Sequence, residues 1–512
     1  MNRYKSLLLL ILGLTTFACS DLKEEPIGIL VPETYFTDVA SVEVAMNGVY
    51  ARLHHRFFLA RETSLPLLLR SDMVDIGDQN TLQERIDHNL FNDIADNGNT
   101  LVAWGAMFDI VSASNLTIFG ASIASGNEDR LNLLSGQAHF TRALAYYHLV
   151  RQFGSVPYIN EPVTDAALMS SISPTSVEDI YVEIISDLEF AKSVLPNTVL
   201  NKSTPSKAAA SAYLASVYLT TGDYANALRE AEEIINNKGT YGLDLEPDFQ
   251  HLFHYADVID SNEPIYVLDF IGRTGVEVTN WTFDYLAPLS GISGNQAYPH
   301  QGGWAVLVPS LSVYNTWNGQ DYRRAVSFDT TAVKSTLNGG NPVDYTQFSL
   351  VDPINPNRPF IAKYHRFPGE NTSANGRESE LDYLLMRYAE VLLIAAEAAV
   401  EEGDNGKAQT YLNMVRARAR NGAVDGDNVK YPPSAVPADH TGAVTVADVL
   451  EERRLELAFE GKRWYDIVRR DLGQAVFSAS GLEGEKPGFV YPDDYLLPIP
   501  ADDVFRNPNL VD

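Results

Sequence analysis

The sequence predicts a mainly α-helical protein, built as a scaffold of helical hairpins with long irregular loop insertions and a few short strands. Apolar residues recur at helical spacing among good helix formers over most of the chain. A two-helix segment occurs twice, at an offset of 181 residues. Between residues 240 and 380, glycine-rich clusters and scattered aromatic residues replace the helical pattern, which predicts loops.

The composition is that of a folded, acidic protein. The 512 residues include 38 Lys and Arg against 67 Asp and Glu, so the formal net charge is −29. This balance argues against a nucleic-acid-binding protein, because neutralising phosphates requires a basic face. Hydrophobic residues make up 45% of the chain, enough for a large buried core. Cys19 is the single cysteine, which excludes internal disulfides and cysteine-rich zinc sites.

The first residues have the pattern of an export signal with a lipid-attachment site. Arg3 and Lys5 precede an apolar run at 7–14 that is too short to span a bilayer. The segment 16–19, Thr-Phe-Ala-Cys, resembles a lipobox, at which a signal peptidase cuts before a cysteine that is then acylated. We expect residues 1–18 to be a lipoprotein signal peptide and residues 19–34 a tether lipidated at Cys19. The alternative is an ordinary signal peptide that contains a cysteine.

Residues 35–512 are expected to form a single domain. Short strands are expected near 264–270 and 360–364. Helical periodicity predicts helices at 39–53, 101–124, 130–152, 176–194, 206–221, 224–237, 383–402, 404–420 and 445–471.

The internal repeat matches Ala215 to Ala396 and the turn residue Gly222 to Gly403. Glycine supplies the positive φ angle that reverses the chain, and small alanines let paired helices approach closely. Two helices joined in this way resemble a tetratricopeptide unit. Because one pair cannot bury its apolar face alone, we expect further pairs, of 39–60 with 101–124 and of 130–152 with 176–194.

Several motifs carry a specific family resemblance. The segment GQAHFTRALAYYHLV at 136–150, continued at 153–157, resembles the signature helix and exit turn of the SusD/RagB family. Further matches to this family lie, in the expected order, at 387–390, 451–466, 497–500 and 507–510.

The signature at 451–466 is predicted to belong to the scaffold. In the helix expected at 445–471, Leu450, Leu457, Trp464 and Val468 form one buried stripe, and Gly461 is expected to allow a close helix contact.

Three glutamates lie beside this stripe. Glu452, Glu456 and Glu460 repeat every four residues, and like charges at that spacing repel unless cations intervene. The alternative is that two of them form an acid/base pair for glycoside cleavage, about 5–10 Å apart across a sugar. We prefer salt bridges between helices, and the available cations are Arg142, Arg387, Arg453 and Arg463.

Catalytic and metal-binding templates are absent from the sequence, which has no HExxH, G-x-S-x-G or GxxxxGK[ST] motif. Asp72, Asp75 and Asp78 are candidate calcium ligands, but their spacing is not that of an EF-hand loop, and a solvated loop is the preferred interpretation. We therefore expect no enzymatic activity, no cofactor and no metal.

The resemblance implies a lipoprotein of the outer membrane, facing the cell exterior. Such a protein would bind an oligosaccharide or polysaccharide and deliver it to a TonB-dependent transporter of the SusC type. The acidic tract at 20–25 resembles a signal for export to the outer face of that membrane. The alternatives are a RagB-like protein that captures peptides, and a secreted glycoside hydrolase on a helical scaffold. The net charge favours a neutral or cationic ligand.

Ligand contacts are expected from the loop-rich insertion at about 240–380, because aromatic faces stack on sugars and polar side chains bind hydroxyls. Trp104 and Trp317 are expected to be structural. The predicted aromatic contacts are Trp281, Tyr285, Tyr298 and Trp304, and the predicted polar contacts are Asp72, Asp78, Gln79, Asn80, Asn295 and Gln296.

Overall fold

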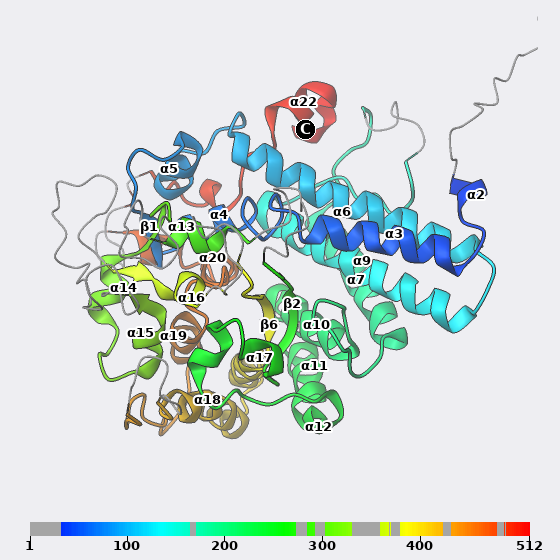
Figure 1. Ribbon diagram of the computed structural model, residues 1–512. Coiled ribbons are helices and arrows are strands. Elements are labelled where there is room, and N and C mark those ends of the chain that lie inside the picture. The colour runs from blue at the N-terminus through cyan, green and yellow to red at the C-terminus, as the bar shows by residue number, and fades with distance from the viewer. Residues whose placement is uncertain are drawn as a thin grey trace, which may run out of the picture.

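The computed structural model shows a helical scaffold with loop-rich segments on one side (Figure 1). It describes residues 32–163, 170–272, 284–291, 303–329, 359–367, 369, 379–422, 432–478, 486 and 488–511. The predicted signal peptide, Cys19 and the acidic tract lie outside the described residues.

The first half of the scaffold consists of helices that pack in chain order. These are α3 (Val39–Leu53), α6 (Gly98–Ile123), α7 (Glu128–Phe153) and α9 (Val177–Val194). Helix α3 packs against α6 and α7 against α9, which confirms both predicted pairs. Helix α6 also packs against α7, so the two pairs form one continuous layer (Figure 1).

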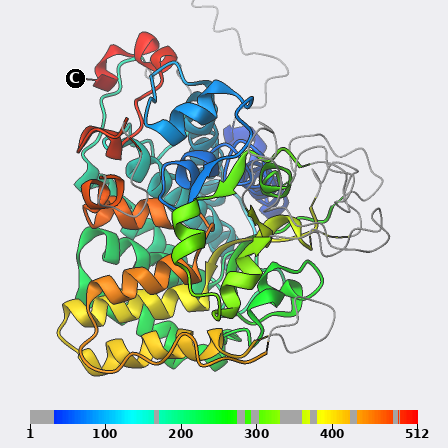
Figure 2. The same cartoon turned by 90° about the vertical axis from the view of Figure 1, so that its left-hand side faces the viewer.

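The predicted repeat corresponds to two helical hairpins. The first joins α10 (Lys207–Thr221) to α11 (Tyr224–Asn236), and the second joins α17 (Tyr388–Glu401) to α18 (Asn405–Ala419). Gly222 and Gly403 have φ angles of 80° and 76° at the two turns, as the repeat predicted. Ala215 and Ala396 are fully buried. Helix α11 packs against α17, so the hairpins lie side by side although they are far apart in the sequence (Figure 2).

The prediction of one continuous helix at 445–471 is wrong, because the segment forms two helices. Helix α19 spans Val446–Glu456 and α20 spans Arg463–Arg469. Between them Phe459 and Gly461 have φ angles of 68° and 71°, which reverse the chain instead of continuing the helix. Gly461 therefore lies in the turn between the two helices, where its positive φ angle is needed. Leu450, Leu457 and Trp464 are still buried, but Val468 is only half-buried.

The remaining elements are short. In the described ranges, three two-stranded antiparallel sheets pair β1 (Val74–Ile76) with β3 (Leu307–Pro309), β2 (Pro264–Leu268) with β6 (Tyr383–Arg387), and β4 (Phe328–Asp329) with β5 (Phe360–Ile361). The strand expected near 264–270 is thus confirmed, whereas the one expected near 360–364 is a strand only at Phe360–Ile361, because a helix begins at Ala362. The other short α-helices are α2 (Pro32–Tyr35), α4 (Ser64–Leu69), α5 (Gln83–Leu90), α12 (Lys238–Tyr241), α13 (Leu286–Ser290), α14 (Leu311–Thr316), α15 (Tyr322–Ser327), α16 (Ala362–His365), α21 (Gly473–Phe477) and α22 (Ala501–Arg506).

Glu452, Glu456 and Glu460 are buried and ion-paired, as predicted. Glu456 accepts hydrogen bonds from Arg323 (3.0 Å), Arg387 (2.5 Å) and Arg418. The other pairs are Glu460 with Lys363 (2.7 Å) and Arg387 (2.9 Å), and Glu452 with Arg323 (2.6 Å) and Arg416 (2.6 Å).

The predicted partners of these glutamates need a correction. Four arginines were expected to pair with these glutamates. In the described part of the chain, only Arg387 does so. The others bind aspartates: Arg142 binds Asp187 (2.6 Å), Arg453 binds Asp466 (2.9 Å) and Arg463 binds Asp72 (2.8 Å).

Helix α6 is unusually apolar. Within the described part of the chain it is the one helix whose length and composition would allow it to cross a membrane. It packs against α3 and α7 as a helix of the scaffold, yet only 44% of its most apolar window is buried.

Candidate functional site

Two loops distant in the sequence meet at the end of the β1–β3 ladder. Val74 to Ile76 pair antiparallel with Leu307 to Pro309. The pairing continues beyond the strands, because the Gly77 N–H donates to Val306 O (3.0 Å) and the Asp78 N–H to Ala305 O (2.7 Å). This register places Asp78 opposite Ala305, the residue that follows Trp304.

An aromatic pair lies at this junction. The ring centroids of Trp304 and Tyr285 are 5.9 Å apart, with an interplanar angle of 34°. Backbone hydrogen bonds fix both residues, from the Trp304 N–H to Pro288 O (2.6 Å) and from the Tyr285 N–H to Ala60 O (3.2 Å). Trp304 is half-buried whereas Tyr285 is 4% exposed, so Trp304 offers the accessible ring and Tyr285 supports it.

Short polar side chains follow β1 next to this pair. Asp78 is half-buried, and its Oδ1 accepts a hydrogen bond from the Asn80 N–H (2.9 Å). Gln79 and Asn80 are exposed. We call Asp78, Gln79, Asn80, Tyr285 and Trp304 the loop site. It combines an accessible indole ring with amide and carboxylate groups, as in sites for neutral polyhydroxylated ligands.

Guanidinium groups also gather here. Cζ of Arg61 lies 4.8 Å from the Tyr285 ring centroid and Cζ of Arg56 lies 5.8 Å from it. Arg61 is paired with Glu62. Arg85 donates a hydrogen bond to Thr81 (3.0 Å). Burial lowers the pKa of Arg85, although the nearby carboxylates of Glu62 and Asp78 act to raise it. Locally the site is therefore not acidic, unlike the protein as a whole.

Sequence reasoning missed these arginines. Arg56 and Arg61 follow α3 and Arg85 lies in α5, all outside the insertion in which ligand contacts were expected. Nothing in the local sequence pattern distinguishes them, because they reach the site only through the fold.

One carboxyl group at the site is strongly perturbed. Asp284 is fully buried and accepts a hydrogen bond from the Leu286 N–H (2.8 Å) at the start of α13. Burial raises its pKa to about 7, although the backbone N–H groups of Leu286 and Ala287 oppose the shift.

Two predicted contacts are corrected by the structure. Asp72 is fully buried, and both its oxygens accept hydrogen bonds from Arg463 (2.8 and 2.9 Å), so its carboxylate is a structural ion pair. Tyr285 supports a neighbouring ring instead of offering its own face to a ligand.

The other predicted residues divide into two groups. Trp104 and Trp317 are each 4% exposed and belong to the core, as expected. Trp281, Tyr298, Asn295 and Gln296 lie outside the described residues.

The calcium hypothesis gains no geometric support. Asp72 is held by Arg463, and Oδ1 of Asp75 accepts a hydrogen bond from Asn89 (2.8 Å). In the described ranges, no three His, Cys, Asp or Glu side chains are grouped so as to hold a metal ion.

Comparison with known proteins identifies the family. The family model of the SusD family matches residues 351–512, and a model described as starch-binding and associating with the outer membrane matches residues 39–219. SusD-like protein P2 of Formosa agariphila is 43% identical over 512 residues, covering 100% of this chain and 99% of that protein. The chain belongs to the SusD family. A SusD-like protein of Bacteroides ovatus is 24% identical over 88% of the chain and 79% of its own length.

Solved structures of SusD-like proteins share this fold. A laminarin-binding SusD-like protein superposes with a TM-score of 0.74 at 21% identity, covering 92% of this chain and 98% of the other. Surface glycan-binding protein A of Bacteroides thetaiotaomicron, solved in complex with laminarihexaose, gives a TM-score of 0.71 at 21% identity, again covering 92% and 98%. The tetratricopeptide-like scaffold is thus the fold of SusD-like structures.

Proposed function

We propose that this protein is a cell-surface lipoprotein that binds a nutrient glycan and delivers it, without catalysis, to a SusC-like TonB-dependent transporter. The observation that carries the proposal is the meeting of two segments at the end of the β1–β3 ladder, one with the half-buried ring of Trp304 and the other with Asp78, Gln79 and Asn80. SusD-like proteins of the same fold are named for binding laminarin or were solved with laminarihexaose, which supports a glycan as the class of ligand.

The chemistry of the loop site suits sugar capture. The C–H face of a pyranose or furanose stacks on an indole ring, and Tyr285 with Arg61 holds that ring in place. Asp78 accepts hydrogen bonds from hydroxyl groups, and the amides of Gln79 and Asn80 both donate and accept. Glu452, Glu456 and Glu460 do not suit an acid/base pair, because each is ion-paired with buried cations.

The lipid anchor at Cys19 belongs to the same proposal, as does the location on the outer face of the outer membrane. Acylation would hold the binding site beside the transporter. Labelled palmitate should be incorporated into the native chain and not into a Cys19→Ala variant. Equal incorporation into both would contradict the anchor site.

Affinity electrophoresis tests the binding function. We expect the protein from residue 20 onward to be retarded in a gel containing one polysaccharide of a panel, and Trp304→Ala to lose that retardation. Tyr491→Ala is the control, since Tyr491 is an aromatic residue with 41% exposure that is not part of the loop site. It should migrate like the parent protein.

Three results would contradict the proposal in different ways. Retardation that survives Trp304→Ala would exclude the loop site. Release of reducing ends from the polysaccharide would show catalysis. Binding of peptides in place of every glycan would favour the RagB-like alternative.

A further inference from the structure

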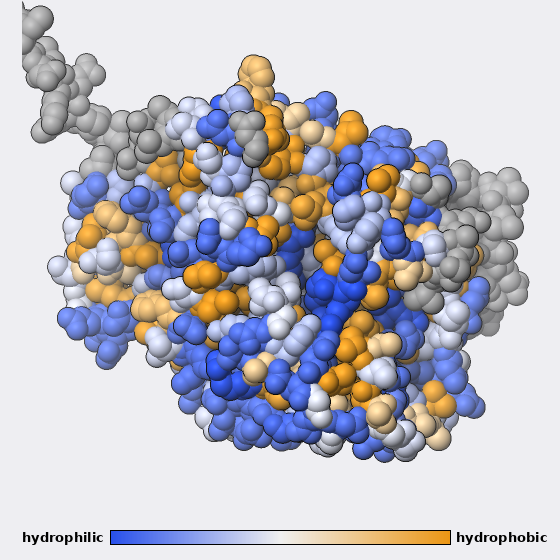
Figure 3. Space-filling model, turned by 180° about the vertical axis from the view of Figure 1, so that it is seen from behind, coloured by the Kyte–Doolittle hydropathy of each residue, from blue (hydrophilic) through white to orange (hydrophobic). Residues whose placement is uncertain are grey.

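A groove separate from the loop site lies between helix α6 and the C-terminal segment. Its volume is about 500 Å³. Phe108 and Ser112 of α6 form the floor together with Gly105, and Ile159, Ile172 and Leu510 form apolar walls. Figure 3 shows that apolar residues gather near the top of the molecule when it is seen from behind. None of these residues belongs to the loop site or to the ion-pair network.

Gly105 makes the groove unusual. It lies in the middle of α6, where a glycine weakens a helix relative to alanine. A Cβ atom added at Gly105 would meet no atom of the described residues within 4 Å, so close packing inside the chain does not require this glycine. A bare backbone on the floor of a groove instead permits close approach by a bound group.

The C-terminal segment extends the apolar surface beside the groove. Helix α22 buries none of its residues, and Phe505 is 89% exposed. Val511 is 62% exposed. Side chains of this kind, exposed next to an apolar groove, mark an interaction surface.

The rim of the groove is acidic. Asp109 and Glu161 are exposed, and Asp503 adds a third carboxylate that is paired with Arg506 (3.2 Å). The net charge at the rim is negative, so a flat anionic lipid surface would be repelled. A concave, acidic and apolar site fits a protruding apolar side chain that is flanked by cations.

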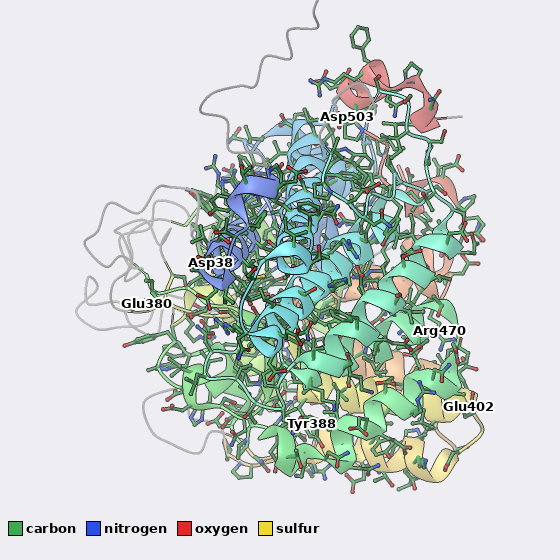
Figure 4. The ribbon with its side chains drawn as sticks, turned by 90° about the vertical axis from the view of Figure 1, so that its right-hand side faces the viewer. Asp38, Glu380, Tyr388, Glu402, Arg470 and Asp503 are labelled. Atoms are coloured by element: carbon green, nitrogen blue, oxygen red, sulfur yellow. The ribbon has the colours of Figure 1, made fainter. Side chains whose placement is uncertain are left out.

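We propose that this groove, which we call the α6 groove, binds a protein segment that presents one aromatic or aliphatic side chain between Lys or Arg residues. Under the proposed function, this segment would belong to the transporter. Only that assignment rests on the proposed function. Asp503, which lines the groove, lies on α22 near the top of the molecule (Figure 4).

Fluorescence polarisation tests the groove with defined peptides and the protein from residue 20 onward. The probe is a labelled pentapeptide with a central phenylalanine between lysine and arginine. Its controls are the same peptide with serine for phenylalanine, and one with glutamates for both cations. We expect saturable binding of the first peptide, and binding of either control weaker by about tenfold or more.

Gly105→Leu places a side chain in the groove and should not destabilise the fold, because a Cβ atom at this position meets no other atom of the described residues within 4 Å. We expect it to raise the Tm, since leucine is a better helix former, and to weaken probe binding by about tenfold or more. Gly48→Leu is the matched control, because Gly48 also lies within a helix, α3, away from the groove. It should leave binding unchanged. The double variant Asp109→Lys with Glu161→Lys should prefer the acidic peptide.

Equal binding of the probe by the Gly105→Leu variant would overturn the proposal. Binding of anionic phospholipid vesicles that Gly105→Leu abolishes would also overturn it, in favour of a lipid surface. Glycan retardation without peptide binding would refute only the α6 groove. Peptide binding without any glycan retardation would refute the proposed function and leave the groove intact.

Discussion

At the scale of single residues, the buried carboxyl of Asp284 links the loop site to pH. Its pKa is raised to about 7, so between about pH 4 and pH 7 the folded protein holds a proton that the unfolded chain has released. Stability from this group is therefore present at low pH and is lost as the pH rises toward neutrality.

Asp284→Asn should remove this dependence while still accepting the hydrogen bond from Leu286. Relative to the parent, the free energy of unfolding of the variant should rise by up to about 1.4 kcal/mol per pH unit across that range. Denaturant unfolding at several pH values measures the difference. A difference that stays constant with pH would show that Asp284 is ionised in the folded protein.

The loop site was only partly predictable at this scale. Trp304 and Asp78 were predicted as contacts because loop aromatics and short polar residues are typical of binding sites. The sequence could not show that Asp72, two residues before β1, is buried against Arg463, which lies 391 positions away. Arg61 was not predicted for the same reason, because its contact with the Tyr285 ring depends on a residue far away in the sequence.

At the scale of elements, Glu456 connects α19 to its neighbours. Burial alone would raise its pKa, but Arg418, Arg387 and Arg323 lower it far below the usual range. The stability contributed by this glutamate is present above the pKa of an unfolded glutamate, about 4.3, and is lost as the pH falls through the depressed folded pKa.

Glu456→Gln should destabilise the protein by about 3–5 kcal/mol at neutral pH, because buried arginines would lose their counter-charge. Glu451→Gln is the control: its side chain is 49% exposed, and it should cost less than about 1 kcal/mol. Urea unfolding compares the two. If both variants lost the same free energy of unfolding, the buried ion pairs of Glu456 would contribute no more than an exposed ion pair.

The hairpin turns allow a second test of element geometry. Gly403→Ala should cost about 1–2 kcal/mol, because its φ angle of 76° is strained for any residue with a Cβ. Gly406→Ala, at the beginning of α18, should be neutral or stabilising. Thermal unfolding of both variants measures the difference, and a neutral Gly403→Ala would refute the assigned turn.

Element prediction succeeded where local signals were strong and failed where the turn was unusual. The two hairpins were recognised because alanine and glycine recur at matching positions. The break after Glu456 was missed because Phe459 adopts a positive φ angle that its residue type does not favour. Neighbouring elements impose that conformation, so the sequence of the segment alone suggested one long helix.

At the scale of the whole molecule, the C-terminal region is tied into the N-terminal half. The Lys486 ammonium donates to Leu69 O (2.9 Å), Ser71 O (3.2 Å) and Asn89 Oδ1 (3.1 Å). Farther along, the Leu497 N–H donates to Gln152 O (2.7 Å). These hydrogen bonds join distant parts of the chain, and one domain over 35–512 stays a prediction.

Lys486→Met should therefore lower the free energy of unfolding of the whole protein by about 2–3 kcal/mol, because it leaves buried acceptors without their donor. Lys407→Met, at a side chain with 42% exposure, is the control and should have little effect. Calorimetry should show one transition in every variant. Two separate transitions would contradict the single domain.

The contact between α11 and α17 also has a consequence for how the chain reaches its fold. Roughly 150 residues separate these helices, so closing this contact requires a long loop, which slows folding. While the polypeptide is being synthesised, the first hairpin exposes the apolar face that α17 later covers. We therefore expect the nascent chain to expose this face until its last quarter is available, and refolding in vitro to be slow and prone to aggregation at high protein concentration.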